Sequence, residues 1–174
     1  MRVIFRALFT FLVILASSLA GYAQLSTTGK EFWVGFMENN RSLPNTPDYA
    51  VLVITATENT TGAIEYLGQA AAFSLTAGQQ FTFRLSSADL DLLHRSSDVI
   101  ENLGIYITSS GKIAVHAFNE RFRSADGTVV LPLGALGKDH YITSHFEVNP
   151  LGNLNLNNES TLLVVATEDN TRIE

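Results

Sequence analysis

The sequence predicts an all-β fold, an antiparallel β-sandwich-like domain with one short helix. Apolar and polar residues alternate with a period of two in segments that recur roughly every 10 to 15 residues. β-Branched and aromatic residues are concentrated in these segments, and turn-forming residues lie between them. The chain has 174 residues, of which 46% are hydrophobic and 16% charged. It is therefore long and apolar enough to bury the core of one domain.

Nine segments carry this strand pattern. Residues 49–57 (YAVLVITAT) form the most apolar run, which predicts a strand that is buried on both faces. Residues 80–85 (QFTFRL) alternate cleanly, with the phenylalanines expected to face the core. Residues 109–112 (SSGK) and 126–127 (DG) are expected to be turns between strands. The other expected strands are 31–37, 63–67, 103–108, 113–119, 128–133, 141–146 and 161–167.

A single short helix is predicted near residues 87–94. Residues 86–89 (SSAD) have the spacing of a capping box ahead of Leu90, Leu92 and Leu93. Two loops are also expected. Pro44 and Pro47 mark the first, over residues 39–48, and the second covers residues 150–158 (PLGNLNLNN).

Residues 1–23 have the pattern of a secretory signal peptide. Arg2 and Arg6 supply the positive start, an apolar stretch of about 12 residues follows, and residues 21–23 (GYA) provide small residues for cleavage before Gln24. The apolar stretch is shorter than the ~20 residues of a spanning helix. We therefore expect a secreted or cell-surface protein with no membrane span after cleavage.

The processed chain is expected to be acidic and free of cysteine. Removing residues 1–23 leaves nine Lys and Arg against seventeen Asp and Glu, a net charge of −8. This charge argues against a nucleic-acid partner. The absence of cysteine excludes disulfides, thiolate metal sites and cysteine nucleophiles. A secreted chain of this size without cysteine is more typical of bacteria than of an animal extracellular module.

Two strand-and-turn units resemble one another within the chain. Residues 53–60 (VITATENT) are similar to residues 164–171 (VVATEDNT), and the shared Ala-Thr-Glu words lie 110 positions apart. Chance similarity between two such units is one explanation. The other is a repeat, which predicts a binding domain over residues 24–158 and a second β unit that starts at residue 159 and is cut off at residue 174.

Several segments resemble one known family in the same order. Residues 29–36 (GKEFWVGF) are similar to the opening of the IgGFc-binding protein N-terminal domain family. Further segments resemble later parts of that domain: 104–110 (GIYITSS), 113–119 (IAVHAFN), 124–137 (SADGTVVLPLGALG) and 161–170 (TLLVVATEDN). The resemblance covers about residues 29–171, which is nearly the whole processed chain.

This resemblance implies a β-rich binding or adhesion module that is not an enzyme. Members of the family include a mucus protein that binds the Fc part of IgG and many secreted bacterial proteins. We therefore expect a non-catalytic module at the cell exterior with a protein or glycan ligand and no cofactor. The alternatives are a structural spacer repeat of a larger surface protein and, less favoured, a glycan-active enzyme domain.

One candidate interaction loop stands out. Arg121 and Arg123 flank Phe122 in a region that is otherwise short of positive charge, and Ser124 and Asp126 follow. Two guanidinium groups beside an aromatic ring suit a carboxylate or an acidic sugar. Solvated arginines at a hairpin end are the simpler explanation, but these five residues are the predicted ligand site.

The remaining candidates for chemistry have simpler structural explanations. His140 and His145 are five residues apart and would face opposite sides of a strand, so no metal site is expected. Asp139, His140 and Ser144 lack the G-x-S-x-G elbow of a hydrolase, so no catalytic residue is assigned. Trp33, the only tryptophan, could serve as a sugar platform, but core packing is the favoured role.

Overall fold

The computed structural model describes residues 26–39, 46–142 and 161–173 and confirms the all-β prediction. A seven-stranded antiparallel sheet forms the body, and a small parallel pair, β2 with β7, lies beside it. The elements are β1 (Thr28–Val34), β2 (Phe36–Met37), β3 (Tyr49–Ala56), β4 (Thr60–Tyr66), β5 (Gln69–Leu75), β6 (Gln80–Ser86), β7 (Leu93–His94), β8 (Ile105–Arg121), β9 (Ser124–Val130) and the 3₁₀ turn η1 (Leu133–Ala135).

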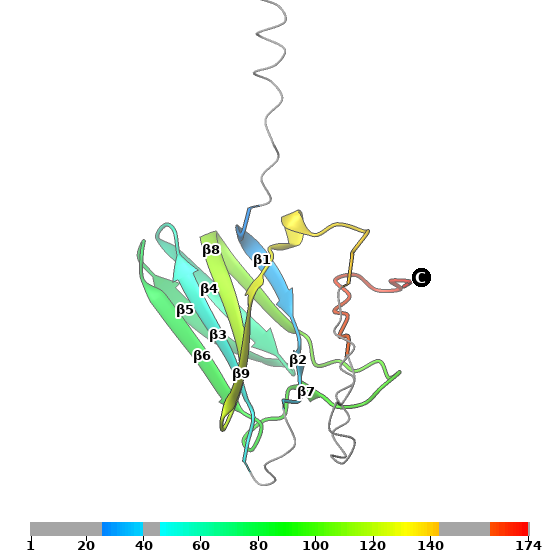
Figure 1. Ribbon diagram of the computed structural model, residues 1–174. Helices are drawn as coiled ribbons and strands as arrows, with labels where there is room; N and C mark the ends of the chain where they lie inside the picture. Colours follow the sequence, from blue (N-terminus) through cyan, green and yellow to red (C-terminus); the bar gives the residue numbers. More distant parts are fainter. Residues whose placement is uncertain (1–25, 40–45, 143–160, 174) are drawn as a thin grey trace, which may run out of the picture.

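The long strand β8 organises the sheet because four other strands pair with it (Figure 1). β1 and β4 lie on opposite sides of its first half, with the start of β1 reaching Ile113 and Ala114, and β3 and β9 lie on opposite sides of its second half. β5 then extends the sheet beyond β4, and β6 extends it beyond β3. Two four-stranded halves result, β5-β4-β8-β1 and β6-β3-β8-β9, and they share β8.

The two halves face each other across one hydrophobic core. Phe32, Ile64 and Ile107 come from one half and pack in the same buried cluster as Leu52 and Val115 from the other. The Tyr66 and Phe83 rings meet across this core with their centroids 5.0 Å apart. The alternation of buried and exposed residues along the strands thus produces the expected sandwich-like packing.

A line of bends and strand connections runs across the sheet and allows the sheet to fold over. It passes through residues 109–112 of β8, through the connection 57–59 between β3 and β4, and through the connection 76–79 between β5 and β6. On the other side of β8, the pairing of β1 shifts register between Gly29 and Glu31. We call this line the fold line.

Side-chain oxygens satisfy the backbone amides that the fold line removes from strand pairing. The N–H of Gly111 donates to Oγ1 of Thr60 at 2.8 Å, and the N–H of Lys112 donates to Oε1 of Glu58 at 2.6 Å. The N–H of Ala77 donates to Oδ1 of Asn59 at 3.0 Å. Gly111 is buried, and a Cβ there would lie only 2.8 Å from Cγ of Glu58. This close approach explains why a glycine occupies the bend.

The turn predicted at residues 109–112 is wrong, because these residues are the bend within β8. Their N–H groups bond to partners about fifty positions away, so the chain continues instead of reversing. The turn predicted at residues 126–127 is also wrong, since both residues lie within β9 and pair with β8. β5 was not predicted, because its alanine-rich sequence QAAAFSL lacks the usual strand residues.

The helix predicted near residues 87–94 is wrong. The N–H groups of Asp89 and Leu90 both reach the carbonyl oxygen of Ser86, which makes a single turn. The hydroxyl of Ser86, the first residue of the predicted capping box, accepts the N–H of Ala88 at 3.2 Å, and the hydroxyl of Ser87 accepts the N–H of Asp48 at 3.0 Å. The chain then extends through the buried Leu92 into β7.

Several expected segments differ from the prediction or lie outside the described residues. β9 ends at Val130, before η1, instead of continuing to residue 133. Residues 161–167 are extended but form no strand pairing within the described part of the chain, and the same holds for residues 141 and 142. Residues 1–23, 40–45 and 143–158 lie outside the described residues, so the signal peptide, the second loop and most of the first loop stay predictions.

Residues 163 and 165 of the extended segment contact the body of the fold. A Cβ on Gly35 would lie 2.8 Å from Cδ2 of Leu163 and 3.0 Å from Cγ2 of Val165. Leu162 and Val164, which alternate with them, are exposed. The segment therefore has strand-like alternation, with one side on the fold and the other toward solvent. That the segment starts a second β unit stays a prediction.

Removing the Thr60 hydroxyl is expected to destabilise the fold line. Thr60→Val keeps the shape of the side chain but leaves the buried N–H of Gly111 without its acceptor, which should lower the free energy of unfolding by about 1–3 kcal/mol. Urea denaturation measures this change. The matched control is Thr82→Val on the exposed side of β6, expected within about 0.5 kcal/mol of the parent chain. Equal effects of the two substitutions would contradict this role of Thr60.

Candidate binding site at the β8–β9 hairpin

The structure places the predicted interaction loop at the tip of the β8–β9 hairpin. Arg121 ends β8 and pairs with Ser124 at the start of β9, so Phe122 and Arg123 form a two-residue turn. Arg123 has a φ of 66°, in the left-handed region that non-glycine residues seldom adopt. Asp126 lies further along, on the exposed part of β9. The five predicted residues are therefore close together in the fold.

The two residues of the turn are presented to solvent. The side chain of Phe122 is 58% exposed, and Arg123 is also exposed. The guanidinium carbon of Arg123 lies 5.0 Å from the centroid of the Phe122 ring, within the range of a cation–π contact. The tip thus combines an apolar ring with a positive charge, which suits an acidic or aromatic partner.

Arg121, in contrast, points into the protein. Its side chain is only 8% exposed, and its Nη1 lies 3.3 Å from Oδ1 of the buried Asp48. This contact is an ion pair without hydrogen-bond geometry at Oδ1, while Oδ2 of Asp48 accepts the N–H of Asn39 at 3.1 Å. Arg121 also donates from Nε to Oγ1 of Thr46 at 3.4 Å. Its position is that of an anchor beneath the tip.

A chain of polar side chains continues from this ion pair to the base of the hairpin. The hydroxyl of Ser124 donates to Oδ1 of Asn39 at 2.8 Å. Nδ2 of Asn39 donates to the carbonyl oxygen of Asn119 at 3.2 Å, and Nδ2 of Asn119 donates to the carbonyl oxygen of Met37. Ser124 therefore acts in fixing the hairpin. Sequence reasoning missed Asp48, Asn39 and Asn119, because no local pattern links residues about 80 positions apart.

β9 provides a second exposed feature next to the tip. Within the described part of the chain it pairs with β8 alone, so its other backbone edge is open. Most of its residues, Asp126 among them, are exposed, and only Val130 is buried. An open edge of this kind can accept an added strand from a partner.

The histidines do not gather into a metal site among the described residues. No group of three or more potential metal-ligating side chains is found there. Nδ1 of His94 lies 3.0 Å from Oε2 of Glu101, and Nε2 of His140 lies 3.0 Å from the carbonyl oxygen of Gly137. His145 and Ser144 lie outside the described residues.

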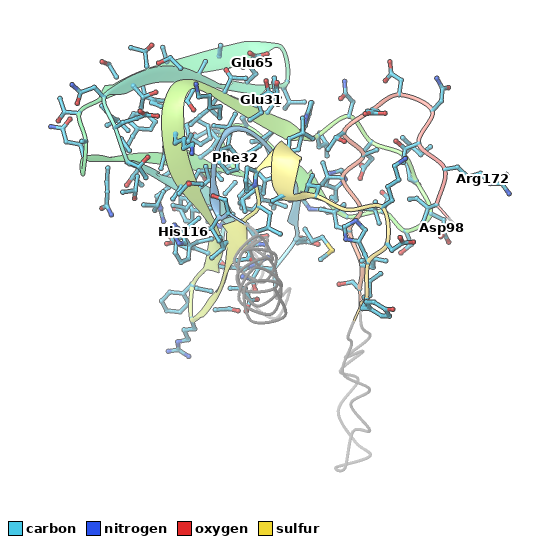
Figure 2. The ribbon with its side chains drawn as sticks, turned by 90° about the horizontal axis from the view of Figure 1, so that it is seen from above. Glu31, Phe32, Glu65, Asp98, His116 and Arg172 are labelled. Atoms are coloured by element: carbon cyan, nitrogen blue, oxygen red, sulfur yellow. The ribbon has the colours of Figure 1, made fainter. Side chains whose placement is uncertain are left out.

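The core position predicted for Trp33 is wrong. Phe32 is fully buried, so its neighbour Trp33 points to the outer face of the sheet, where it is partly exposed. There its ring stacks on Tyr106, with centroids 4.6 Å apart and planes 25° apart. In Figure 2, Glu31 and Glu65 lie together on this outer side of the molecule.

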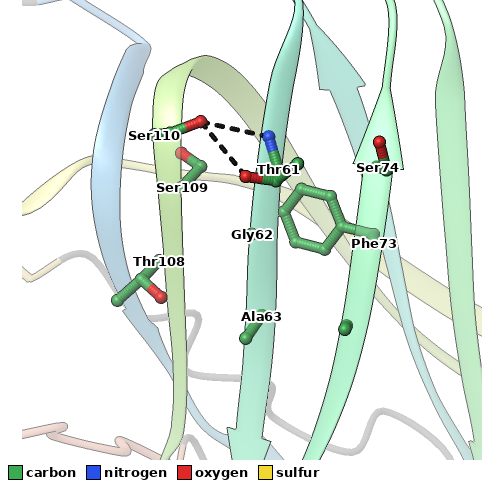
Figure 3. A pocket seen from close by; sticks show the side chains of 9 residues that line it. Thr61, Gly62, Ala63, Phe73, Ser74, Thr108, Ser109 and Ser110 are labelled. Atoms are coloured by element: carbon green, nitrogen blue, oxygen red, sulfur yellow. Dashed lines mark hydrogen bonds between the residues drawn. The ribbon is translucent and has the colours of Figure 1, made fainter.

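A shallow depression of about 700 Å³ lies on the same outer face, over β5, β4 and β8 (Figure 3). Its lining consists mostly of small residues, among them Ala63, Ala72 and Thr108. The hydroxyl of Ser110 accepts the N–H of Thr61 at 3.1 Å at its upper end. The depression holds no titratable side chain, so it offers surface shape without acid–base chemistry.

Comparison with known proteins supports the resemblance found in the sequence. Residues 126–174 match the family model described as IgGFc binding protein. This match begins within β9 and includes the extended segment 161–167, so the resemblance is confirmed over the C-terminal part of the chain. No curated protein and no solved structure was found to match. Among the described residues, no helix is long and apolar enough to cross a membrane.

The two arginines of the hairpin are expected to respond differently to the same substitution. Arg121→Met leaves the buried Asp48 without its cation, which should lower the free energy of unfolding by about 3–5 kcal/mol. Arg123→Met changes an exposed side chain and should stay within about 0.5 kcal/mol of the parent. Urea denaturation of both variants gives the comparison. If Arg121→Met is as stable as Arg123→Met, the ion pair does not anchor the hairpin.

Proposed function

We propose that this chain is a non-catalytic binding module at the cell exterior, with its contact surface at the β8–β9 hairpin. The surface consists of Phe122 and Arg123 at the tip and of Asp126 on the open edge of β9. Arg121 and Ser124 do not contact the partner; they hold the hairpin in place through the ion pair with Asp48 and the hydrogen bond to Asn39. The partner is a protein or a glycan, and no cofactor takes part.

One observation carries this proposal: an exposed ring and cation stand on a hairpin that a buried ion pair ties to the body of the fold. Exposed loops positioned by a rigid scaffold are a common form of binding surface. Because the ion pair fixes the end of β8 next to this turn, binding there would lose less backbone entropy than binding by an unanchored loop. Aromatic and arginine side chains also dominate the binding energy of many interfaces.

The family match supports a binding role over a catalytic one. The matched residues 126–174 include most of β9, which forms the open edge of the proposed surface. The family's description names the Fc part of IgG as its ligand, so an Fc fragment is the first ligand to test. An exterior location agrees with the signal peptide predicted at residues 1–23.

A spacer repeat within a larger surface protein is the second candidate. The observation that favours it is the extended segment 161–167. Its apolar residues Leu162 and Val164 are exposed on one side, as they would be on a strand whose partner is absent. In that case the exposed side of the segment would meet neighbouring β structure. The hairpin tip would then have no ligand, so binding experiments on the tip separate the two candidates.

Binding to immobilised IgG Fc, and to a glycan panel in parallel, tests the proposal. Phe122→Ala with Arg123→Ala removes both tip side chains and is expected to weaken binding at least about tenfold, since both belong to the central contact. The matched control, Leu67→Ala with Lys138→Ala, removes an exposed apolar group and a cation elsewhere and should bind like the parent.

Circular dichroism confirms that each variant is folded before binding is measured. Equal binding by the tip variant and the control would remove the hairpin from the contact surface. A folded parent chain that binds neither Fc nor any glycan would favour the spacer.

A further inference from the structure

A second group of residues, on the outer face of the sheet, combines aromatic rings with acidic side chains. Trp33 of β1 lies directly opposite Tyr106 of β8, and Tyr106 lies directly opposite Glu65 of β4. Glu31 precedes Trp33 by two residues and shares its face. Figure 2 shows Glu31 and Glu65 on the same side of the molecule. We call Glu31, Trp33, Glu65 and Tyr106 the acidic aromatic face.

The stacking of the two rings determines which ring surface stays open. One face of the Trp33 ring stacks on one face of the Tyr106 ring, with the ring centroids 4.6 Å apart. Gly104 also lies against the indole of Trp33: a Cβ on Gly104 would be 3.4 Å from the indole ring. The remaining face of Tyr106 is turned toward the strand that carries Glu65. A group that stacks on Tyr106 there would also meet a carboxylate.

Both carboxylates lack a cation among the described residues. No ion pair of this part of the chain includes Glu31, Glu65 or the neighbouring Lys30. Partial burial raises the pKa of the Tyr106 phenol, and the negative charges of Glu31 and Glu65 raise it further. The potential at the ring is therefore negative, which attracts a cation and disfavours an anion.

The surface around the acidic aromatic face leaves room for a partner chain. The row that contains Glu31 continues through Thr108 and Ala63 to Ala72, all small side chains. These three residues line the shallow depression of Figure 3. An incoming backbone could lie over this depression while one of its side chains reaches Tyr106.

We propose that the acidic aromatic face binds an arginine or lysine side chain of a basic protein partner. The cation stacks on the open face of Tyr106 between the carboxylates of Glu31 and Glu65, and the partner's backbone lies over the depression. Cation–π attraction and charge complementarity act together there. A sugar is less well matched, because the stacked rings offer no broad apolar platform and the carboxylates need a counter-charge. The site adds a second contact to the proposed binding function and includes no hairpin residue.

Trp33 is the only tryptophan of the chain, so its indole N–H gives one resonance that reports on this face directly. We would titrate the purified, isotope-labelled chain with acetyl-tetra-arginine amide and follow this resonance by NMR at physiological salt. A saturable shift with a dissociation constant of about 1 mM or tighter is expected. Glu31→Gln with Glu65→Gln should weaken it at least about tenfold.

The matched control removes the same charge elsewhere. Asp89→Asn with Asp98→Asn changes two exposed carboxylates, and Figure 2 shows Asp98 well away from Glu31 and Glu65. Its binding should change less than about twofold, because screening limits distant charges at this salt concentration. The variant Phe122→Ala with Arg123→Ala should bind the peptide like the parent, so failure at the hairpin and failure at this face are distinguishable.

Three outcomes would overturn the proposal. The first is the absence of a saturable shift with the peptide at about 10 mM. The second is equal weakening in the Glu31/Glu65 variant and the Asp89/Asp98 control, which would indicate nonspecific attraction to an acidic protein. The third is a saturable shift with cellotetraose that persists in the Glu31/Glu65 variant, which would assign the face to glycans.

Discussion

The need to satisfy backbone hydrogen bonds at the fold line governs the rest of this structure. A sheet that bends sharply loses ladder pairing at the bend, and buried N–H groups without acceptors are strongly unfavourable. Here Glu58 and Asn59, in the connection between β3 and β4, and Thr60, the first residue of β4, supply the missing acceptors. Only because this line is satisfied can the two halves of the sheet face each other and enclose a common core.

The ion pair between Asp48 and Arg121 has a comparable role at the hairpin. Taking both charges out of water is unfavourable, so the pair adds little stability compared with an apolar core, but it strongly disfavours arrangements that separate the charges. Its geometric effect is to fix the end of β8, which leaves Phe122 and Arg123 as the exposed turn. Two arginines that look equivalent in the sequence thus differ completely in environment.

The sequence predicts what depends on local periodicity and misses what depends on distant partners. The strands at residues 49–57 and 80–85 were found because alternation and burial are local signals. Residues 109–112 have the composition of a turn, yet Thr60 and Glu58 accept their N–H groups and keep the strand continuous. The helix expected at 87–94 is a single turn, after which the chain runs into β7, and the pairing of β7 with the distant β2 leaves no local signal.

The candidate site shows the same division. The cluster of Arg121 to Asp126 was found from composition, and the structure does bring these residues together. The burial of Arg121 depends on Asp48, 73 positions earlier, which no local pattern reveals. Trp33 was assigned to the core from its apolar neighbours, but the alternation of the strand gives that position to Phe32. A shift of one residue therefore separates a core side chain from a surface one.

The residues that match the family model adjoin both proposed contact surfaces. They begin at Asp126 in β9, whose open edge lies beside the hairpin tip. They also include Val165, whose Cγ1 would lie 3.9 Å from a Cβ on Gly104, the residue that flanks Trp33. The extended segment therefore lies next to the acidic aromatic face, with Leu163 and Val165 toward the fold and Leu162 and Val164 exposed. A partner that uses both surfaces would thus meet the matched residues at two separate places, β9 and the extended segment.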